Sequence, residues 1–120
     1  MEIPEVVLNT GKKMPLIGFG TADVPLPPLQ TVVSVIIDAI ELGYRHFDTA
    51  FFYGSGEPLG QAVALALKLG LIKSREELSI TSKLWCTDAH HDLVLPAFNR
   101  TLKYVALFII TVLIYRILIQ

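Results

Sequence analysis

Apolar positions in the first part of the chain alternate between helical spacing and short continuous runs. Helical spacing over 29–42 and 58–69 predicts two amphipathic helices, and a glycine of the kind that ends helices follows each of them. Short apolar runs at 16–21, 44–47 and 78–82 predict three strands, before, between and after these helices. Because strands alternate with helices, the pattern predicts an α/β fold with a parallel sheet and right-handed crossovers.

Further elements complete this pattern. Residues 6–8 and 14–16 flank a turn that contains Gly11, which predicts an N-terminal hairpin. The stretch 74–77 has capping-box spacing, a Ser followed three residues later by a Glu, and predicts one helical turn. A third helix is expected after the third strand, with Asp92 as its N-cap. Its apolar stripe consists of Val94, Phe98 and Leu102. The predicted order is a hairpin followed by about three βα units.

Residues 104–120 form an apolar tail that breaks the alternation, and we therefore divide the chain at 1–103 and 104–120. Three interpretations of the tail remain open. It is read-through of non-coding sequence, a substitute fourth strand or extended third helix, or a membrane anchor through 104–119. An anchor needs about 20 apolar residues, and Arg116 interrupts this run. We expect the tail to pack on the rest of the chain or to drive aggregation, and not to span a bilayer.

Length and composition limit the function classes. At 120 residues the chain is shorter than a complete eight-stranded α/β barrel, which needs about 250 residues. The net charge of −1 gives no electrostatic footprint for nucleic acid. Cys86 is the single cysteine, which excludes an intrachain disulfide and suits a reducing compartment. The N-terminal residues lack the apolar segment of a signal peptide, so we expect a cytoplasmic protein.

Three polar residues, Thr21, Asp48 and Lys83, occupy equivalent places at the ends of successive predicted strands. Loops from several strands meet at this edge of a parallel sheet, and chemistry gathers there. Tyr53 lies in the loop after Asp48. A free phenol is a weak acid with a pKa of about 10, and a neighbouring ammonium favours its phenolate. The pattern is typical of a proton-handling site in which Asp48 holds Lys83, Lys83 tunes Tyr53, and Tyr53 protonates a carbonyl. The alternative is that Asp48 caps the next turn and Tyr53 packs.

Two stretches resemble the aldo-keto reductases. GYRHFDTAFFYGSGEPLG, residues 43–60, is similar to a family signature, although the family usually has Glu where this chain has Gly56. SITSKLW, residues 79–85, resembles the second catalytic strand. TSKLWCTDAHHDLVLPA resembles the plant codeinone- and chalcone-reductase-like branch. The resemblance runs from about Val6 to about Lys103. It implies the N-terminal part of a TIM (β/α)8 barrel, whose bottom the hairpin closes. It also implies NADP(H)-dependent reduction of a ketone or aldehyde to an alcohol, in enzymes that are usually monomeric.

The resemblance also implies roles for particular residues. Asp48, Tyr53 and Lys83 match three members of the family's catalytic tetrad, and Trp85 matches a residue that walls the substrate pocket. Gly20, Thr21 and Asp48 would contact the nicotinamide side of the cofactor. The fourth tetrad member, a histidine, has no match, and Arg116 falls near its place.

The three histidines of the chain are not substitutes for the missing one. We interpret His46 as a core histidine with its hydrogen bonds satisfied. His90 and His91 are adjacent, without the spacing of a helical metal site, so we interpret them as solvated loop residues and expect no metal site.

We therefore expect part of an NADP(H)-dependent oxidoreductase that acts on a small carbonyl substrate, truncated and inactive as this chain. The alternative is a non-enzymatic fragment that acts only by interaction or as a tail-anchored peptide.

Overall fold

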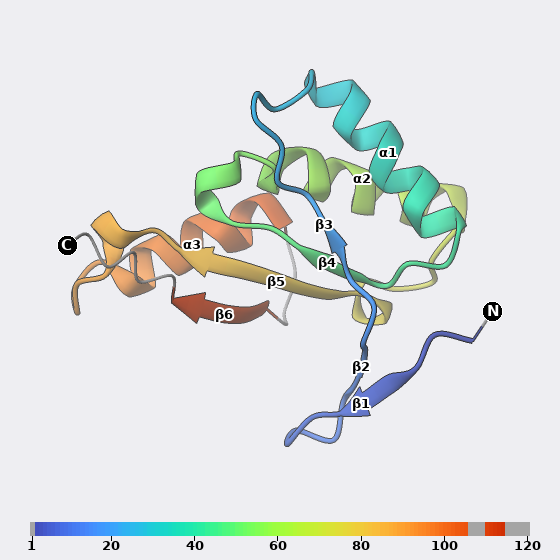
Figure 1. Cartoon of the computed structure of the whole chain (residues 1–120), viewed down its shortest axis with the longest axis horizontal. Helices are drawn as coiled ribbons and strands as arrows, with labels where there is room; N and C mark the ends of the chain where they lie inside the picture. Colours follow the sequence, from blue (N-terminus) through green and yellow to red (C-terminus); the bar gives the residue numbers. More distant parts are fainter. Residues whose placement is uncertain (1, 106–109, 115–120) are drawn as a thin grey trace.

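A computed structural model describes residues 2–105 and 110–114 of the chain (Figure 1). A hairpin precedes alternating strands and helices, as the hydrophobic pattern predicts. The strands are β1 (Glu5–Val7), β2 (Lys13–Pro15), β3 (Phe19–Gly20), β4 (His46–Asp48), β5 (Ser79–Leu84) and β6 (Ile110–Ile114). The α-helices are α1 (Leu29–Glu41), α2 (Gly56–Leu69) and α3 (Val94–Val105). Single 3-10 turns are η1 (Phe51–Tyr53), η2 (Arg75–Glu77) and η3 (Cys86–Asp88).

The main sheet is parallel, with the strand order β3-β4-β5-β6. Phe47 of β4 is opposite Phe19 of β3 on one side and Ile80 of β5 on the other. The hairpin β1–β2 is antiparallel and forms a separate small sheet below the main one in Figure 1. The predicted α/β class, the parallel sheet and the hairpin are therefore confirmed.

The three helices lie along one side of the sheet (Figure 1). The main core fills the space between the strands and the helices α1 and α2. The side chains of Ile36, Phe47, Leu59, Val63 and Ile80 are at most 2% exposed. Burial of such apolar side chains contributes about 1.5–3 kcal/mol each to folding. Successive side chains of a strand point to opposite faces, so the neighbours of Phe47 and Ile80 face away from the helices.

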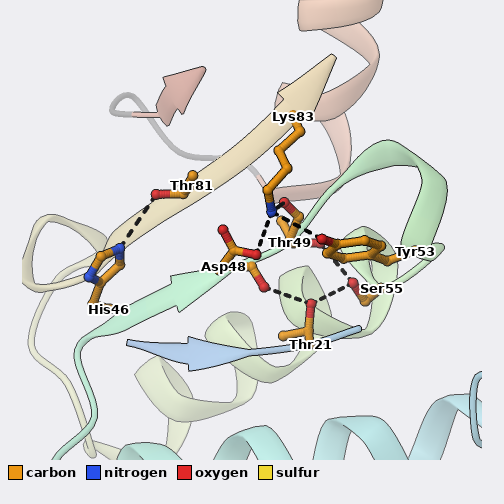
Figure 2. Close-up of polar contacts among 8 residues, drawn as sticks. All are labelled: Thr21, His46, Asp48, Thr49, Tyr53, Ser55, Thr81 and Lys83. Carbon is orange, nitrogen blue, oxygen red and sulfur yellow. Dashed lines mark hydrogen bonds and ion pairs between the residues drawn. The ribbon is translucent and has the colours of Figure 1, made fainter. Parts of the chain in front are cut away.

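That other face of the sheet is polar. His46 Nδ1 lies 2.9 Å from the Pro15 carbonyl oxygen, and its Nε2 lies 3.4 Å from Thr81 Oγ1. Both ring nitrogens of His46 thus have polar partners, as predicted, but the side chain is half-buried on the polar face of the sheet and not in the core. The contact with Pro15 attaches the hairpin to the sheet. Asp48 and Lys83 lie on the same face, nearer the carboxyl ends of the strands (Figure 2).

Several predicted boundaries differ from the structure. β3 is two residues long because Leu16 and Ile17 are exposed and do not pair in the main sheet. α3 begins at Val94, so Asp92 is too early to be its N-cap. In the 74–77 turn Ser74 makes no side-chain cap, and Glu77 Oε1 instead accepts a hydrogen bond of 2.7 Å from the Lys73 amide.

Part of the tail is a strand. Ile110–Ile114 pairs in parallel with β5, which agrees with the interpretation of the tail as a fourth strand. Residues 106–109 and 115–120, which include Arg116, lie outside the described residues. Within the described part of the chain, no helix is both long and apolar enough to cross a membrane.

Candidate active site

The structure brings together the carboxylate, the ammonium and the phenol that the sequence predicts. Lys83 Nζ donates hydrogen bonds to Asp48 Oδ1, to Tyr53 OH at 3.2 Å and to the Thr49 carbonyl oxygen at 3.3 Å (Figure 2). Asp48 pairs with Thr81, two residues before Lys83, so both side chains leave the same face of neighbouring strands. Tyr53 is the last residue of η1, and Gly54 turns the chain immediately after it with a φ of +70°.

The Lys83 side chain is 13% exposed, whereas that of Asp48 is 38% exposed. Burial by itself lowers the pKa of the Lys83 ammonium. The hydrogen bonds and charges of Asp48 and Tyr53 outweigh burial, and the net effect raises the pKa of Lys83 above its ordinary value of 10.5. The ammonium therefore stays charged at neutral pH, 3.2 Å from a phenol oxygen. This arrangement stabilises negative charge on that oxygen when its proton leaves.

Buried hydroxyl groups lie beneath this cluster. Thr21 Oγ1 donates to the Asp48 carbonyl oxygen at 2.9 Å and lies 2.6 Å from Ser55 Oγ. Ser55 Oγ lies 2.7 Å from Thr49 Oγ1. Ser55, Thr49 and Thr21 are 0%, 1% and 8% exposed. Sequence reasoning missed Ser55 and Thr49, because short hydroxyl side chains have several nearby partners and only the fold selects among them.

The two remaining residues predicted to contact the cofactor lie at the carboxyl end of β3. Gly20 is exposed, and a Cβ added there would meet no atom within 4 Å. The Thr21 amide and hydroxyl both bond to the Asp48 carbonyl oxygen, so this side chain serves the internal hydroxyl contacts. Gly20 pairs with Asp48 in the sheet, so an added side chain at Gly20 would project on the same face as the Asp48 carboxylate. Contact with a cofactor stays a prediction for all three residues.

Trp85 follows β5 and stacks on Phe52 of η1, with ring centroids 4.3 Å apart and planes 12° apart. Phe52 belongs to the same turn as Tyr53, and Trp85 comes two residues after Lys83 in the chain. Trp85 and Lys83 also border a cavity of about 150 Å³ between α3 and β5, which is lined almost entirely by apolar groups. The predicted place of Trp85 in the wall of a substrate pocket stays a prediction.

The other candidate residues lie apart from this cluster. His90 and His91 are exposed, as expected of solvated loop residues. Cys86 is a free thiol in η3. No group of three or more potential metal ligands occurs among the described residues.

Comparison with known proteins gives the family. The model of the Aldo/keto reductase family matches residues 16–114. Protein REDOX 2 of Catharanthus roseus is 56% identical over 104 residues, which are 86% of this chain and 32% of that protein. NADPH-dependent codeinone reductase 1-4 of Papaver somniferum is 54% identical over 101 residues, 84% of this chain and 32% of that protein. This chain spans about a third of the length of these relatives. The match passes Lys103 and includes β6, and the expected boundary at Lys103 stays a prediction.

A solved structure confirms the architecture. The crystal structure of a Bombyx mori aldo-keto reductase in complex with NADP is similar, with a TM-score of 0.85 and 37% identity. The two structures superpose over 95% of this chain and 38% of the Bombyx mori chain. The parallel sheet with its helices is part of a TIM barrel, as the resemblance implies. Because the family model matches most of the chain and the fold agrees, this chain belongs to the aldo/keto reductase family.

Proposed function

We propose that this chain carries the proton-handling part of an NADP(H)-dependent reductase that converts a ketone or aldehyde to an alcohol. One observation carries the proposal: the Lys83 ammonium lies within hydrogen-bond distance of both the Asp48 carboxylate and the Tyr53 phenol. When bound, the reduced cofactor supplies the hydride. Tyr53 donates its proton to the carbonyl oxygen, and Lys83 stabilises the phenolate that remains. Asp48 holds the ammonium in place and offsets its burial.

The nicotinamide end of the cofactor fits the described site. Gly20 pairs with Asp48 in the sheet, and a Cβ added at Gly20 would meet no atom within 4 Å. The Asp48 side chain is 38% exposed, and Lys83 links it to Tyr53 (Figure 2). The relatives extend over about three times the matched length, and we infer that most cofactor contacts belong to that remainder. The substrate is a small carbonyl compound, and the aromatic pair of Trp85 and Phe52 forms one wall of its pocket. We place the protein in the cytoplasm.

The 120-residue chain alone is expected to be inactive. Remote parts of a cofactor supply the binding energy that positions its reacting end. The chain matches a third of each relative, so that energy is small here. The test measures NADPH oxidation by the purified chain with a panel of aldehydes and ketones. We expect no rate above that of Tyr53→Phe, and turnover that Tyr53→Phe abolishes would contradict inactivity.

A chimera tests the chemistry itself. Residues 1–103 replace the matched part of the Papaver somniferum codeinone reductase, which is 54% identical in this range. We expect the chimera to reduce its carbonyl substrate. Tyr53→Phe is expected to lower its kcat about 100-fold or more, since general acid catalysis contributes about 10²–10⁴-fold. Lys68→Met, at an exposed position of α2, serves as a control outside the proton transfer. An active chimera that Tyr53→Phe leaves unchanged would refute the assigned acid.

The rival function is a non-enzymatic fragment that acts only by interaction. The Asp48–Lys83–Tyr53 contacts favour the reductase over this rival. Loss of activity in the chimera on Tyr53→Phe supports the reductase.

A further inference from the structure

Ser55 occupies the N-cap of α2 but does not cap it. Ser is a favoured N-cap because its hydroxyl accepts from a free amide of the first turn, which stabilises a helix by about 1 kcal/mol. Here the side chain makes no cap hydrogen bond. It is 0% exposed and lies between Thr21 and Thr49, 2.6 Å and 2.7 Å from their hydroxyl oxygens (Figure 2). The Ser55 hydroxyl therefore acts between the loops rather than within the helix.

The direction of these hydrogen bonds is determined by their last acceptor. Thr21 Oγ1 donates to the Asp48 carbonyl oxygen, which can only accept. Thr21 Oγ1 therefore accepts from Ser55, and Ser55 Oγ accepts from Thr49. Each hydroxyl has only one hydrogen to donate, so this set of bonds has one arrangement. We call these three residues, Thr49, Ser55 and Thr21, the hydroxyl chain.

The hydroxyl chain joins the three segments that form the candidate active site. Thr21 follows β3, Thr49 follows β4, and Ser55 follows the η1 turn that carries Tyr53. Thr49 also holds Lys83 through its carbonyl oxygen at 3.3 Å. Ser55 is two residues from Tyr53, so movement of Ser55 shifts the phenol relative to the ammonium.

We propose that Ser55 is a positioning residue that, through the hydroxyl chain, holds the Tyr53 hydroxyl against the Lys83 ammonium. The inference rests on the proposed function, because this contact has a use only in proton transfer. Ser55 touches no reacting atom and acts through Tyr53. Supporting groups of this kind hold catalytic geometry within about 0.5 Å, and a site without them is too loose.

The test measures Lys83 directly and needs no substrate. Trace labelling of the full chain with acetic anhydride at high dilution, read by mass spectrometry, gives the reactivity of each lysine amine. Lys83 is held as an ammonium by Asp48 and Tyr53 and reacts slowly, whereas Lys68 on α2 is exposed and serves as the internal reference. In Ser55→Ala we expect Lys83 labelling to rise about three-fold or more relative to Lys68, since one hydrogen bond to the ammonium is lost.

Further variants separate positioning from loss of stability. Thr49→Val keeps the side-chain shape and removes one bond of the hydroxyl chain, so it should raise Lys83 labelling too if Ser55→Ala does not fold. Val63→Ala destabilises the buried face of the same helix without touching the hydroxyl chain, and it should leave Lys83 labelling unchanged. Ser55→Ala in a Tyr53→Phe background should add nothing to the effect of Tyr53→Phe alone, because both changes remove the same contact.

Each outcome decides the inference. Unchanged Lys83 labelling in folded Ser55→Ala or Thr49→Val overturns it. An equal rise in Val63→Ala, or full additivity with Tyr53→Phe, shows a structural role and also overturns it. The result is separate from the proposed function, which the activity of the chimera tests. Loss of activity in Tyr53→Phe with no labelling change in Ser55→Ala would remove only the positioning role.

Discussion

At the scale of single residues, the Lys83 ammonium is the centre of the site. Its side chain is 13% exposed, and such a charge is tolerated because three oxygen atoms accept its hydrogens. Two of these atoms belong to side chains with their own chemical roles. The hydrogen bonds to Asp48 and Tyr53 stabilise the Lys83 ammonium in its partly buried position. They also keep it charged beside the Tyr53 phenol.

Because its contacts with Asp48 and Tyr53 outweigh burial and raise the pKa of Lys83, folding stability depends on pH. The stability that the folded Lys83 ammonium contributes is fully present below its unfolded pKa of 10.5. This contribution is lost as pH rises through the higher pKa of the folded state. We expect the free energy of unfolding, measured in urea, to fall on the alkaline side of 10.5. The fall should be smaller in Lys83→Met and unchanged in the exposed control Lys68→Met. Equal pH dependence in all three proteins would contradict the assignment.

At the scale of elements, α2 buries one apolar face, and Gly70 follows it as a residue suited to ending a helix. α2 runs from Gly56 to Leu69 although Pro58 is its third residue, because a first-turn amide has no partner within the helix. At the other end Gly70 adopts a φ of +73°, and its amide bonds to the Leu67 carbonyl oxygen at 3.1 Å. Gly56, the first residue of α2, and Gly70, which follows its last residue, therefore differ in their need for glycine.

This difference gives a matched pair of variants. Gly56 is not in the left-handed region, and an added Cβ would meet Tyr104 Cβ at 3.7 Å, an ordinary contact. We expect Gly56→Ala to stabilise the chain by about 0.4–1 kcal/mol. Gly70→Ala places a side chain at positive φ and should destabilise by about 1–2 kcal/mol. Urea unfolding of both variants measures the difference, and shifts of the same sign would be inconsistent with this assignment of backbone conformations.

At the scale of the whole molecule, the sheet has two unlike faces. The face toward α1, α2 and α3 is apolar, and the opposite face of the described strands carries His46, Asp48, Thr81 and Lys83. β6, which lies within the tail, is the fourth strand of this sheet. Pairing of Ile110–Ile114 with β5 satisfies backbone groups that a bilayer anchor would satisfy by forming a helix.

We therefore expect the tail not to span a membrane. Residues 104–119 as a helix would extend about 24 Å at 1.5 Å per residue, which is shorter than a bilayer core of about 30 Å. A soluble reporter fused to residues 101–120 should be released from membranes by alkaline carbonate, and the matched Ile110→Lys fusion should behave identically. A reporter that stays in the membrane pellet, and that Ile110→Lys releases, would show an anchor.

The sequence alone determined the order of elements and the three reacting groups of the proposed site. Apolar spacing predicts α1 and α2, because burial of one face is a local property of the pattern. The placement of Asp48 and Lys83 at equivalent strand ends predicts that they meet, since parallel strands align their carboxyl ends.

The tertiary structure alone decided which contacts the small polar residues make. The sequence pattern does not single out Ser55, and it becomes a link between loops because folding places Thr21 and Thr49 beside it. The sequence predicts Ser74 and Asp92 as helix caps. Ser74 makes no cap hydrogen bond in the structure, and Asp92 lies two residues before α3 begins. β3 is shorter than its apolar run because a strand needs a paired neighbour as well as a pattern. A short side chain has several nearby partners, and only the packed chain selects among them.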